Sequence, residues 1–346
     1  VRYIQWRRLV VRLLIIRNIH YVLVFMTILL SGCGDGVVID QEKFNMSILN
    51  QKPVFTINFH ATGARYRLYL NGVLIERQGS SQGQNSYEIP VNHWMRSGEN
   101  KLDLTVYPNE EGENIPPSSQ IKALLQVRDF GEQENYTLGG FAFSGANYKE
   151  AVLDESYQRD VESFTTVEAG GISVSELGMM ENSPYDGARK YSLTFEIPSN
   201  LTLWEFFNSE NVPDFMVVTD EEYGKLRLEL YEVLRKIQDH LEQGKVDEIM
   251  PLFAERNRET DLAFYKEEGQ TERELHSDFT NDIPTLNMID LDERSSAYES
   301  EENLKLTSSF RADRTNAISG NLKSGPGNLS FPIMFRKQDG KWIITR

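Results

Sequence analysis

The fold class is indicated most strongly by residues 65–75, Arg65-Tyr66-Arg67-Leu68-Tyr69-Leu70-Asn71-Gly72-Val73-Leu74-Ile75. Apolar and polar side chains alternate along 65–70, as expected for a strand with one face in the core. Asn71-Gly72 is the pair preferred in a two-residue type I′ turn, because both central residues of that turn need a positive φ. Apolar residues resume directly after the turn, so the stretch predicts an antiparallel β-hairpin.

The same alternation recurs on both sides of this hairpin. Its apolar positions are Phe55/Ile57/Phe59, Leu102/Leu104/Val106, Ala123/Leu125/Val127 and Tyr191/Leu193/Phe195/Ile197. Stretches rich in glycine, serine, asparagine and proline separate these runs. Many short strands with turns at this spacing predict an antiparallel β-sandwich domain over residues 53–215.

A helical pattern replaces the alternation at Thr219. Thr219-Asp220-Glu221-Glu222 predicts a capping box. Behind it, apolar residues recur every three or four positions until Gly244, a residue that suits a helix end: Tyr223, Leu226, Leu230, Leu234, Ile237 and Leu241. Thr271-Glu272-Arg273-Glu274 predicts a second capping box. Helices are therefore expected in the first part of a C-terminal domain.

Strand patterns return after residue 300 and end in a hairpin. Leu304/Leu306/Phe310 and Leu329/Phe331/Ile333/Phe335 alternate with other residues, and Asp339-Gly340 marks a turn before Lys341-Trp342-Ile343-Ile344. Helices followed by an antiparallel meander predict a compact α+β domain over residues 219–346. The chain as a whole is thus expected to be α+β.

This order and the ending 335–344 resemble the nuclear-transport-factor-2-like cone fold, whose members end in a similar strand–Asp-Gly–Lys-Trp hairpin. The resemblance implies a cone-like domain at 219–346. The chain departs from the family by an extra polar, helix-like stretch at 254–266. The resemblance implies no activity, because the cone pocket serves enzymes and binding proteins alike.

The charge is divided unevenly along the 346 residues, whose net charge is −16. Residues 1–33 contain five arginines and no acidic residue, which leaves 31 basic and 52 acidic residues, or −21, for the rest of the chain. A basic head before an acidic body is typical of a targeting segment. The acidic body argues against binding to nucleic acid.

The N-terminal segment has the pattern of a lipoprotein leader. Its apolar run, residues 19–30, is shorter than the ~20 residues needed to span a bilayer. The following Leu30-Ser31-Gly32-Cys33 resembles the lipobox of bacterial lipoproteins. The resemblance implies a signal peptide at 1–32, acylation of Cys33 after cleavage, and a lipidated tether at 33–52. Gly34 favours the outer membrane, facing the periplasm, and the single cysteine excludes an internal disulfide.

Neither metal ligands nor a cofactor motif is found at suitable spacing. The histidines that follow the leader are widely separated, and Asp290-Leu291-Asp292 with Glu301 is interpreted as a solvated acidic loop because Arg294 and Ser295 break the EF-hand pattern. We therefore expect no metal and no cofactor. Ser119-Gln120-Ile121-Lys122 has the spacing of a penicillin-binding-protein nucleophile motif, but it lies among predicted strands, where that motif does not function.

Five residues are candidate partner or pocket contacts: Arg258, Glu259, Asp261, Trp94 and Trp204. On a helix the first three predict a solvated face with exposed pairs, and the alternative is that they point into the cone pocket. The two tryptophans predict core positions, and the alternative is a partner anchor. A sugar-binding face would use Trp94, Tyr87 and Tyr69 as a stacking platform.

The sequence favours a lipid-anchored cell-envelope lipoprotein that binds a protein partner and is not an enzyme. One concrete form is an immunity protein that neutralises a periplasmic toxin, since such partners need charge complementarity and no chemistry. Two alternatives stay open. One is a carbohydrate- or peptidoglycan-binding module, and the other is a hydrolase or isomerase that uses the cone pocket.

Overall fold

The computed structural model describes ten segments of the chain. They are residues 52–79, 83–109, 115–133, 135–145, 174–179, 188–197, 201–215, 217–293, 296–311 and 315–346. The lipobox, the predicted signal peptide and almost all of the predicted tether lie outside the described residues.

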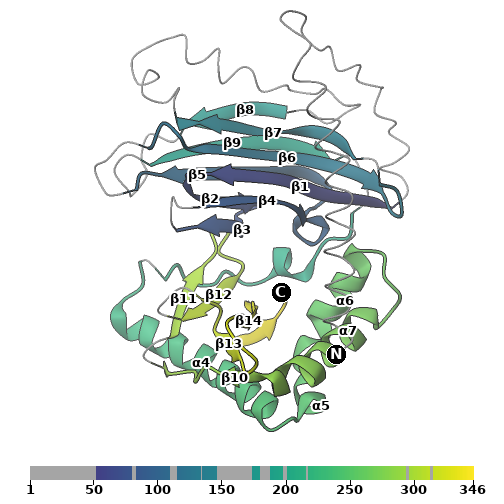
Figure 1. The fold of residues 1–346 in the computed structure, drawn as a ribbon, viewed down its shortest axis with the longest axis vertical. Coiled ribbons are helices and arrows are strands. Elements are labelled where there is room, and N and C mark those ends of the chain that lie inside the picture. The colour runs from purple at the N-terminus through teal and green to yellow at the C-terminus, as the bar shows by residue number, and fades with distance from the viewer. Residues whose placement is uncertain are drawn as a thin grey trace, which may run out of the picture. The chain divides into compact units, whose positions relative to one another are not determined.

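The N-terminal half contains two antiparallel sheets (Figure 1). The first has the order β4 (Gln84–Pro90), β1 (Pro53–Thr62), β6 (Gln120–Asp129) and β7 (Tyr136–Ser144). The second has the order β3 (Val73–Gln78), β2 (Arg65–Leu70), β5 (Gly98–Tyr107), β9 (Arg189–Ile197) and β8 (Val174–Met179). Alternate residues of both sheets, such as Phe55, Ile57, Leu68 and Leu104, form one buried core. The alternation in the sequence thus corresponds to the side of each strand that faces this core.

The hairpin predicted at Asn71-Gly72 is confirmed. β2 and β3 pair antiparallel, and both turn residues have positive φ, 52° and 73°. Gly72 is also constrained by packing, because an added Cβ would lie 2.8 Å from the backbone nitrogen of Asn303. The turn therefore serves both as a hairpin and as a contact with the C-terminal half.

Four α-helices occupy the described first part of the C-terminal half. They are α4 (Asp220–Glu242), α5 (Val246–Ile249), α6 (Ala254–Ala263) and α7 (Gln270–Asp282), with the 3-10 turn η4 (Met250–Phe253) between α5 and α6. The capping box at Thr219 is confirmed, because its side chain and that of Glu222 each accept from the other residue's backbone N–H. The capping box predicted at Thr271 is wrong. α7 begins two residues earlier than this cap implies, with Gly269 at the N-cap, and the backbone N–H of Thr271 donates to Asp261 Oδ1 at 2.8 Å.

Two further antiparallel sheets complete this half. One has the order β10 (Leu286–Met288), β13 (Ile318–Leu322) and β14 (Asn328–Phe331). The other has the order β11 (Ser296–Ser300), β12 (Thr307–Arg311), β15 (Met334–Gln338) and β16 (Lys341–Ile344). Helices α4–α7 gather around these strands (Figure 1), and the mixture of helices with antiparallel sheets confirms the α+β class.

The strand patterns after residue 300 are confirmed in part. The Asp339-Gly340 turn joins β15 to β16 as predicted, with φ of 50° and 71°. The alternating run 329–335 is not one strand, because the chain leaves β14 at Pro332 and enters the other sheet as β15. Proline has no N–H for a ladder hydrogen bond, which explains the break at this position.

The two halves pack against each other within one compact unit of residues 43–346. Ala263 and Leu306 from the C-terminal half join the core of the N-terminal sheets. A second core lies among α4, α5, α7 and the C-terminal strands. Among the described residues there is no helix of sufficient length and hydropathy to span a membrane.

Candidate functional site

Arg346 is the centre of a buried junction between the two halves. Its Nη1 donates to Glu259 Oε2 at 2.5 Å, and its Nη2 donates to the backbone oxygen of His93 at 2.9 Å. Both side chains of the ion pair are almost completely buried. The other carboxylate oxygen of Glu259 accepts the backbone N–H of Glu205 at 2.8 Å. A charge-assisted bond of this kind, once desolvated, holds its elements in one geometry.

Three aromatic rings surround the same guanidinium group. The Cζ of Arg346 lies 5.0 Å from the ring centroid of Trp94, 5.1 Å from that of Phe206 and 5.9 Å from that of Trp204. The Trp204 indole nitrogen donates to the backbone oxygens of Met95 and Asn92 at 2.9 and 3.1 Å. These distances are within the range of cation–π attraction. The cage formed by the rings thus holds a residue of the chain itself.

His93 adds a neutral side chain to the junction. Burial lowers its pKa well below the ordinary value, and the positive charges of Arg346 and Arg256 act in the same direction. A protonated imidazole beside these two guanidinium groups would add a third buried positive charge. At neutral pH the His93 imidazole is therefore uncharged, and it does not act as an acid in this junction.

The structure brings together three of the five candidate residues, Glu259, Trp94 and Trp204. Glu259 is 2% exposed and Trp94 is 7% exposed, so they form a closed contact and not an open pocket. Arg258 lies at its rim, with a side chain that is 60% exposed and 3.9 Å from Glu205. Asp261 is buried and accepts a backbone N–H at the start of α7. The core interpretation of both tryptophans is confirmed.

The prediction that Arg258, Glu259 and Asp261 form a solvated face is wrong for Glu259 and Asp261, which are buried, and holds for Arg258, which is exposed. On the same helix, Glu255 makes a bidentate ion pair with Arg336, with N–O distances of 2.5 and 2.7 Å. Polar side chains of α6 are buried because the helix lies between the two halves and finds its partners there. No apolar stripe marks α6, so periodicity could not reveal its burial.

Two smaller expectations are also corrected. The proposed stacking platform does not exist as a surface, because Trp94 and Tyr69 are buried and only Tyr87, at 41%, is exposed. Glu301 is not part of a solvated loop. It is buried, and its Oε2 accepts the backbone N–H of Leu74 at 2.7 Å. Asp290 instead pairs with Arg235 at 2.6 Å.

Residues with catalytic spacing have structural partners. Ser119 is buried ahead of β6, and its Oγ donates to the backbone oxygen of Gly63 at 2.6 Å. Its position among strands agrees with the prediction that it is not a nucleophile. Within the described residues, no group of three His, Cys, Asp or Glu side chains could hold a metal ion.

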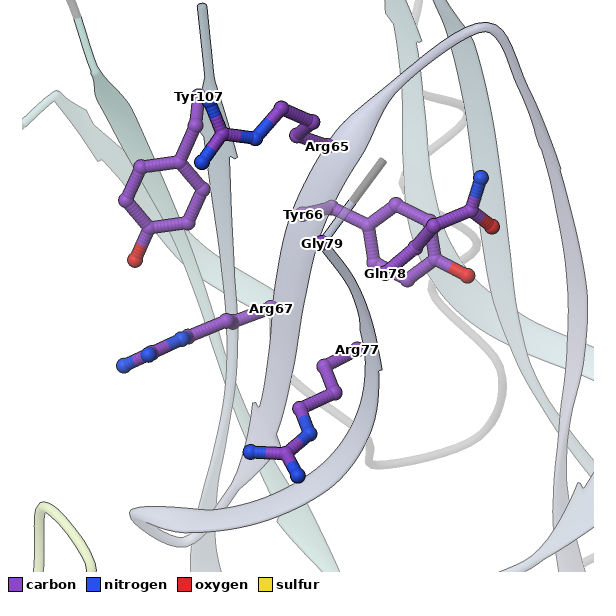
Figure 2. Close-up of a pocket in the computed structure, with 7 residues that line it drawn as sticks. All are labelled: Arg65, Tyr66, Arg67, Arg77, Gln78, Gly79 and Tyr107. Atoms are coloured by element: carbon purple, nitrogen blue, oxygen red, sulfur yellow. The ribbon is translucent and has the colours of Figure 1, made fainter. Parts of the chain in front are cut away.

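An open pocket lies on the outer side of the β3–β2–β5 sheet. Its volume is about 220 Å³, and it is lined by Arg65, Tyr66, Arg67, Arg77, Gln78, Gly79 and Tyr107. In Figure 2 the three arginines and Tyr107 extend to one side of β2, whereas Tyr66 and Gln78 extend to the other. Three guanidinium groups thus share one face in a strongly acidic protein.

Sheet register explains why the arginines meet. Arg67 lies directly opposite Arg77 across β2 and β3, and Arg65 lies directly opposite Tyr107 across β2 and β5. Like charges in directly opposed positions destabilise a sheet. Glu299 and the ring of Phe310, both close to the Arg77 guanidinium group, offset part of this repulsion.

Each arginine is held by a different set of contacts. Arg65 Nη1 donates to the backbone oxygens of Pro108, at 2.8 Å, and of Asn109. Arg67 Nη1 donates to the Tyr69 hydroxyl at 3.4 Å. Arg77 lies 3.8 Å from a carboxylate oxygen of Glu299. Of these three arginines, Arg77 is the one with a carboxylate within ion-pair distance among the described residues.

Sequence reasoning missed this pocket, although part of its signal was present. Arg65 and Arg67 are the polar positions of the alternating stretch before the Asn-Gly turn. Counting back across a two-residue turn places a residue of β3 opposite Arg67, but the bulge between Leu68 and Tyr69 shifts that register. The partner Arg77 could therefore not be identified from the spacing alone.

Comparison with known protein families, with curated proteins and with solved structures gives no match for this chain.

Proposed function

We propose that this chain is a non-enzymatic binding protein that is held to a bacterial envelope membrane by lipid on Cys33. In this proposal it faces the periplasm from the outer membrane and binds a protein partner. The two N-terminal sheets are the predicted β-sandwich, and residues 219–346 are the cone-like domain. The lipid anchor depends on the sequence alone, through Leu30-Ser31-Gly32-Cys33.

One observation carries the binding function: the open pocket is lined by arginine and tyrosine side chains. Guanidinium groups stay charged at all physiological pH values and donate hydrogen bonds without exchanging the proton. Such groups bind a partner well and are poor acid–base catalysts. The carboxylates that would point into a cone pocket, Glu259 and Asp261, have structural partners in the junction and at α7.

The concrete form of the proposal is an immunity protein. Its partner would be a toxin delivered into the periplasm and recognised through the charged surfaces of this chain. The test is co-expression of the full-length chain with the product of the adjacent gene, directed to the periplasm. We expect survival of the cells and a stoichiometric complex on size-exclusion chromatography. Cell death together with the absence of a complex would overturn the immunity form.

The anchor has a separate test. We expect the wild-type chain to incorporate labelled palmitate and to fractionate with the outer membrane, and Cys33→Ser to lose the label. Incorporation of label into Cys33→Ser, or none into the wild type, would contradict lipidation at this residue.

A further inference from the structure

We propose that the arginine pocket, defined as Arg65, Arg67, Arg77, Gly79 and Tyr107, binds a phosphate monoester group. The group can belong to a soluble phosphorylated molecule or to a lipid headgroup with a terminal phosphate. This inference rests on the proposed binding function, because it uses the same pocket. The two can still fail separately, because titration with phosphate needs no protein partner and the co-expression test needs no phosphate.

The arginine pocket has an excess of positive charge. Within the described residues, Arg65 and Arg67 have no carboxylate partner, and Arg77 shares its charge with Glu299 at 3.8 Å. Among the described residues, the three guanidinium groups thus share one nearby carboxylate, Glu299, whose charge also acts on Arg67. This is a local excess of positive charge in a chain whose net charge is −16. A phosphate monoester carries a charge of about −1.5 to −2 at neutral pH, which matches this excess. A carboxylate would neutralise only one guanidinium group.

The arginine side chains are arranged so that their donors can meet one oxyanion. The arginines extend from β2 and β3 on the same side of the sheet, with the Tyr107 ring beside Arg65 (Figure 2). Arg65 is fixed through Nη1 by two backbone oxygens, and its buried Nε has no hydrogen-bond acceptor among the described residues. Guanidinium groups donate in a planar fork that matches phosphate oxygens. A tetrahedral oxyanion in this space would be approached by donors from two strands.

The volume of the pocket and the opposed pair Arg67–Arg77 also favour a small anionic group. A volume of about 220 Å³ is below the ~300 Å³ at which sites for drug-sized ligands begin, so the pocket suits one group of a larger molecule. Arg67 and Arg77 lie directly opposite each other, and Glu299 and the Phe310 ring offset part of the repulsion between them. A bound dianion would convert this repulsion into two charge-assisted contacts.

The test is calorimetric titration of the full-length chain in neutral detergent micelles. The probes are inorganic phosphate, glucose 6-phosphate and dihexanoyl phosphatidic acid, with acetate and dihexanoyl phosphatidylcholine as comparison ligands. We expect phosphate and at least one monoester to bind at least about tenfold more tightly than acetate. Binding of only the sugar phosphate identifies a soluble source, and binding of only the phosphatidic acid identifies a headgroup. Both results support the site.

Three variants locate the binding. Arg67→Gln keeps most of the side-chain stem and is expected to weaken binding at least about tenfold. Gly79→Phe leaves every arginine in place and puts a ring at the pocket, where an added Cβ has no neighbour within 4 Å. It is expected to abolish binding. Arg273→Gln, on the exposed side of α7, is the matched control and should bind as the wild type does.

Specific outcomes would overturn the proposal. One is equal affinity in Arg67→Gln, Gly79→Phe and Arg273→Gln, which would mean adventitious anion binding. Another is acetate binding as tightly as phosphate. A third is no heat of binding with any phosphate probe while thermal unfolding shows the wild type to be folded.

Discussion

Glu301 is a carboxyl group that the fold buries where the β2–β3 hairpin meets the C-terminal half. Its two oxygens accept the backbone N–H of Leu74 and the hydroxyl of Ser308. Burial raises the pKa of Glu301 to about 7, because the lost hydration of the carboxylate outweighs these two hydrogen bonds. The group therefore titrates near neutral pH.

The sign of the resulting pH dependence is fixed. The folded chain binds this proton more tightly than the unfolded chain, whose Glu301 has an ordinary pKa of 4.5. The stabilisation is complete below pH 4.5 and is lost as the pH rises through about 7. Glu301→Gln removes this contribution, so its free energy of unfolding relative to wild type should rise by roughly 2 kcal/mol between acidic and alkaline pH.

The measurement for Glu301 is urea unfolding of both proteins at pH 5 and pH 9. Glu272→Gln, an exposed change on α7, is the control and should show no such difference. A Glu301→Gln profile parallel to that of the wild type would contradict the buried titration.

Gly72 allows a second test at the residue scale, because Gly340 occupies the same place in another turn. Their φ values are 73° and 71°, so alanine at either site adopts a left-handed backbone at a cost of about 1–2 kcal/mol. An added Cβ at Gly340 has no neighbour within 4 Å, whereas at Gly72 it would meet Asn303. We expect Gly72→Ala to cost clearly more than Gly340→Ala in thermal or urea unfolding. Equal costs would show that the hairpin does not press on Asn303.

At the scale of elements, the start of α7 depends on a side chain from α6. Asp261 Oδ1 accepts the backbone N–H of Thr271, and a negative charge there also interacts favourably with the helix dipole. Asp261→Ala should lower the free energy of unfolding by about 1–2 kcal/mol, and Asp261→Asn by less, because an amide oxygen still accepts the hydrogen bond. Urea unfolding with Asp278→Ala, an exposed change on α7, as control measures the difference. Equal losses from the alanine and asparagine variants would contradict the cap.

The elements predicted correctly are those whose signal lies in neighbouring residues of the sequence. Strands 53–62 and 65–78, helix 220–242 and the hairpin at Asp339-Gly340 follow from alternation, helical spacing and turn chemistry. The sequence pattern assigned the cap of α7 to the side chain of Thr271. In the structure, the acceptor for a backbone N–H at the start of α7 is Asp261, which lies on α6. A single sequence contains no signal for such a pairing, since only the packing of α6 beside α7 creates it.

The sequence identified several residues of the candidate site but not how they are arranged. Trp94, Trp204 and Glu259 were singled out, and they do meet, but around Arg346, which is 87 residues from Glu259 in sequence. Nothing in the spacing of these residues indicates a shared guanidinium group. The arginine pocket was missed because alternation marks Arg65 and Arg67 only as outward positions, and outward charge is ordinary in a strand.

At the scale of the whole described chain, buried polar junctions connect the halves. One is the hairpin contact of Gly72, Leu74 and Glu301. In another, the ion pair of Arg346 with Glu259 presents its guanidinium group to the backbone oxygen of His93 in the N-terminal half. Both are desolvated, so their partners cannot be lost without exposing or stranding charge. Such junctions predict that the two halves unfold in one cooperative transition.

A double-mutant cycle on Arg346 and Glu259 measures the ion pair that orients the Arg346 guanidinium group toward the N-terminal half. Arg346→Met and Glu259→Gln should each cost about 3 kcal/mol in urea unfolding, because each leaves the opposite group buried without its partner. The double variant strands no charge, so it should cost less than the sum of the single variants by at least about 1 kcal/mol. The same cycle on Arg128 and Glu88, an exposed pair 2.6 Å apart within one sheet, should give a coupling below about 1 kcal/mol. Additive effects of the Arg346 and Glu259 variants would show that this ion pair does not hold the junction. Two separate unfolding transitions in the wild type would contradict cooperative unfolding of the halves.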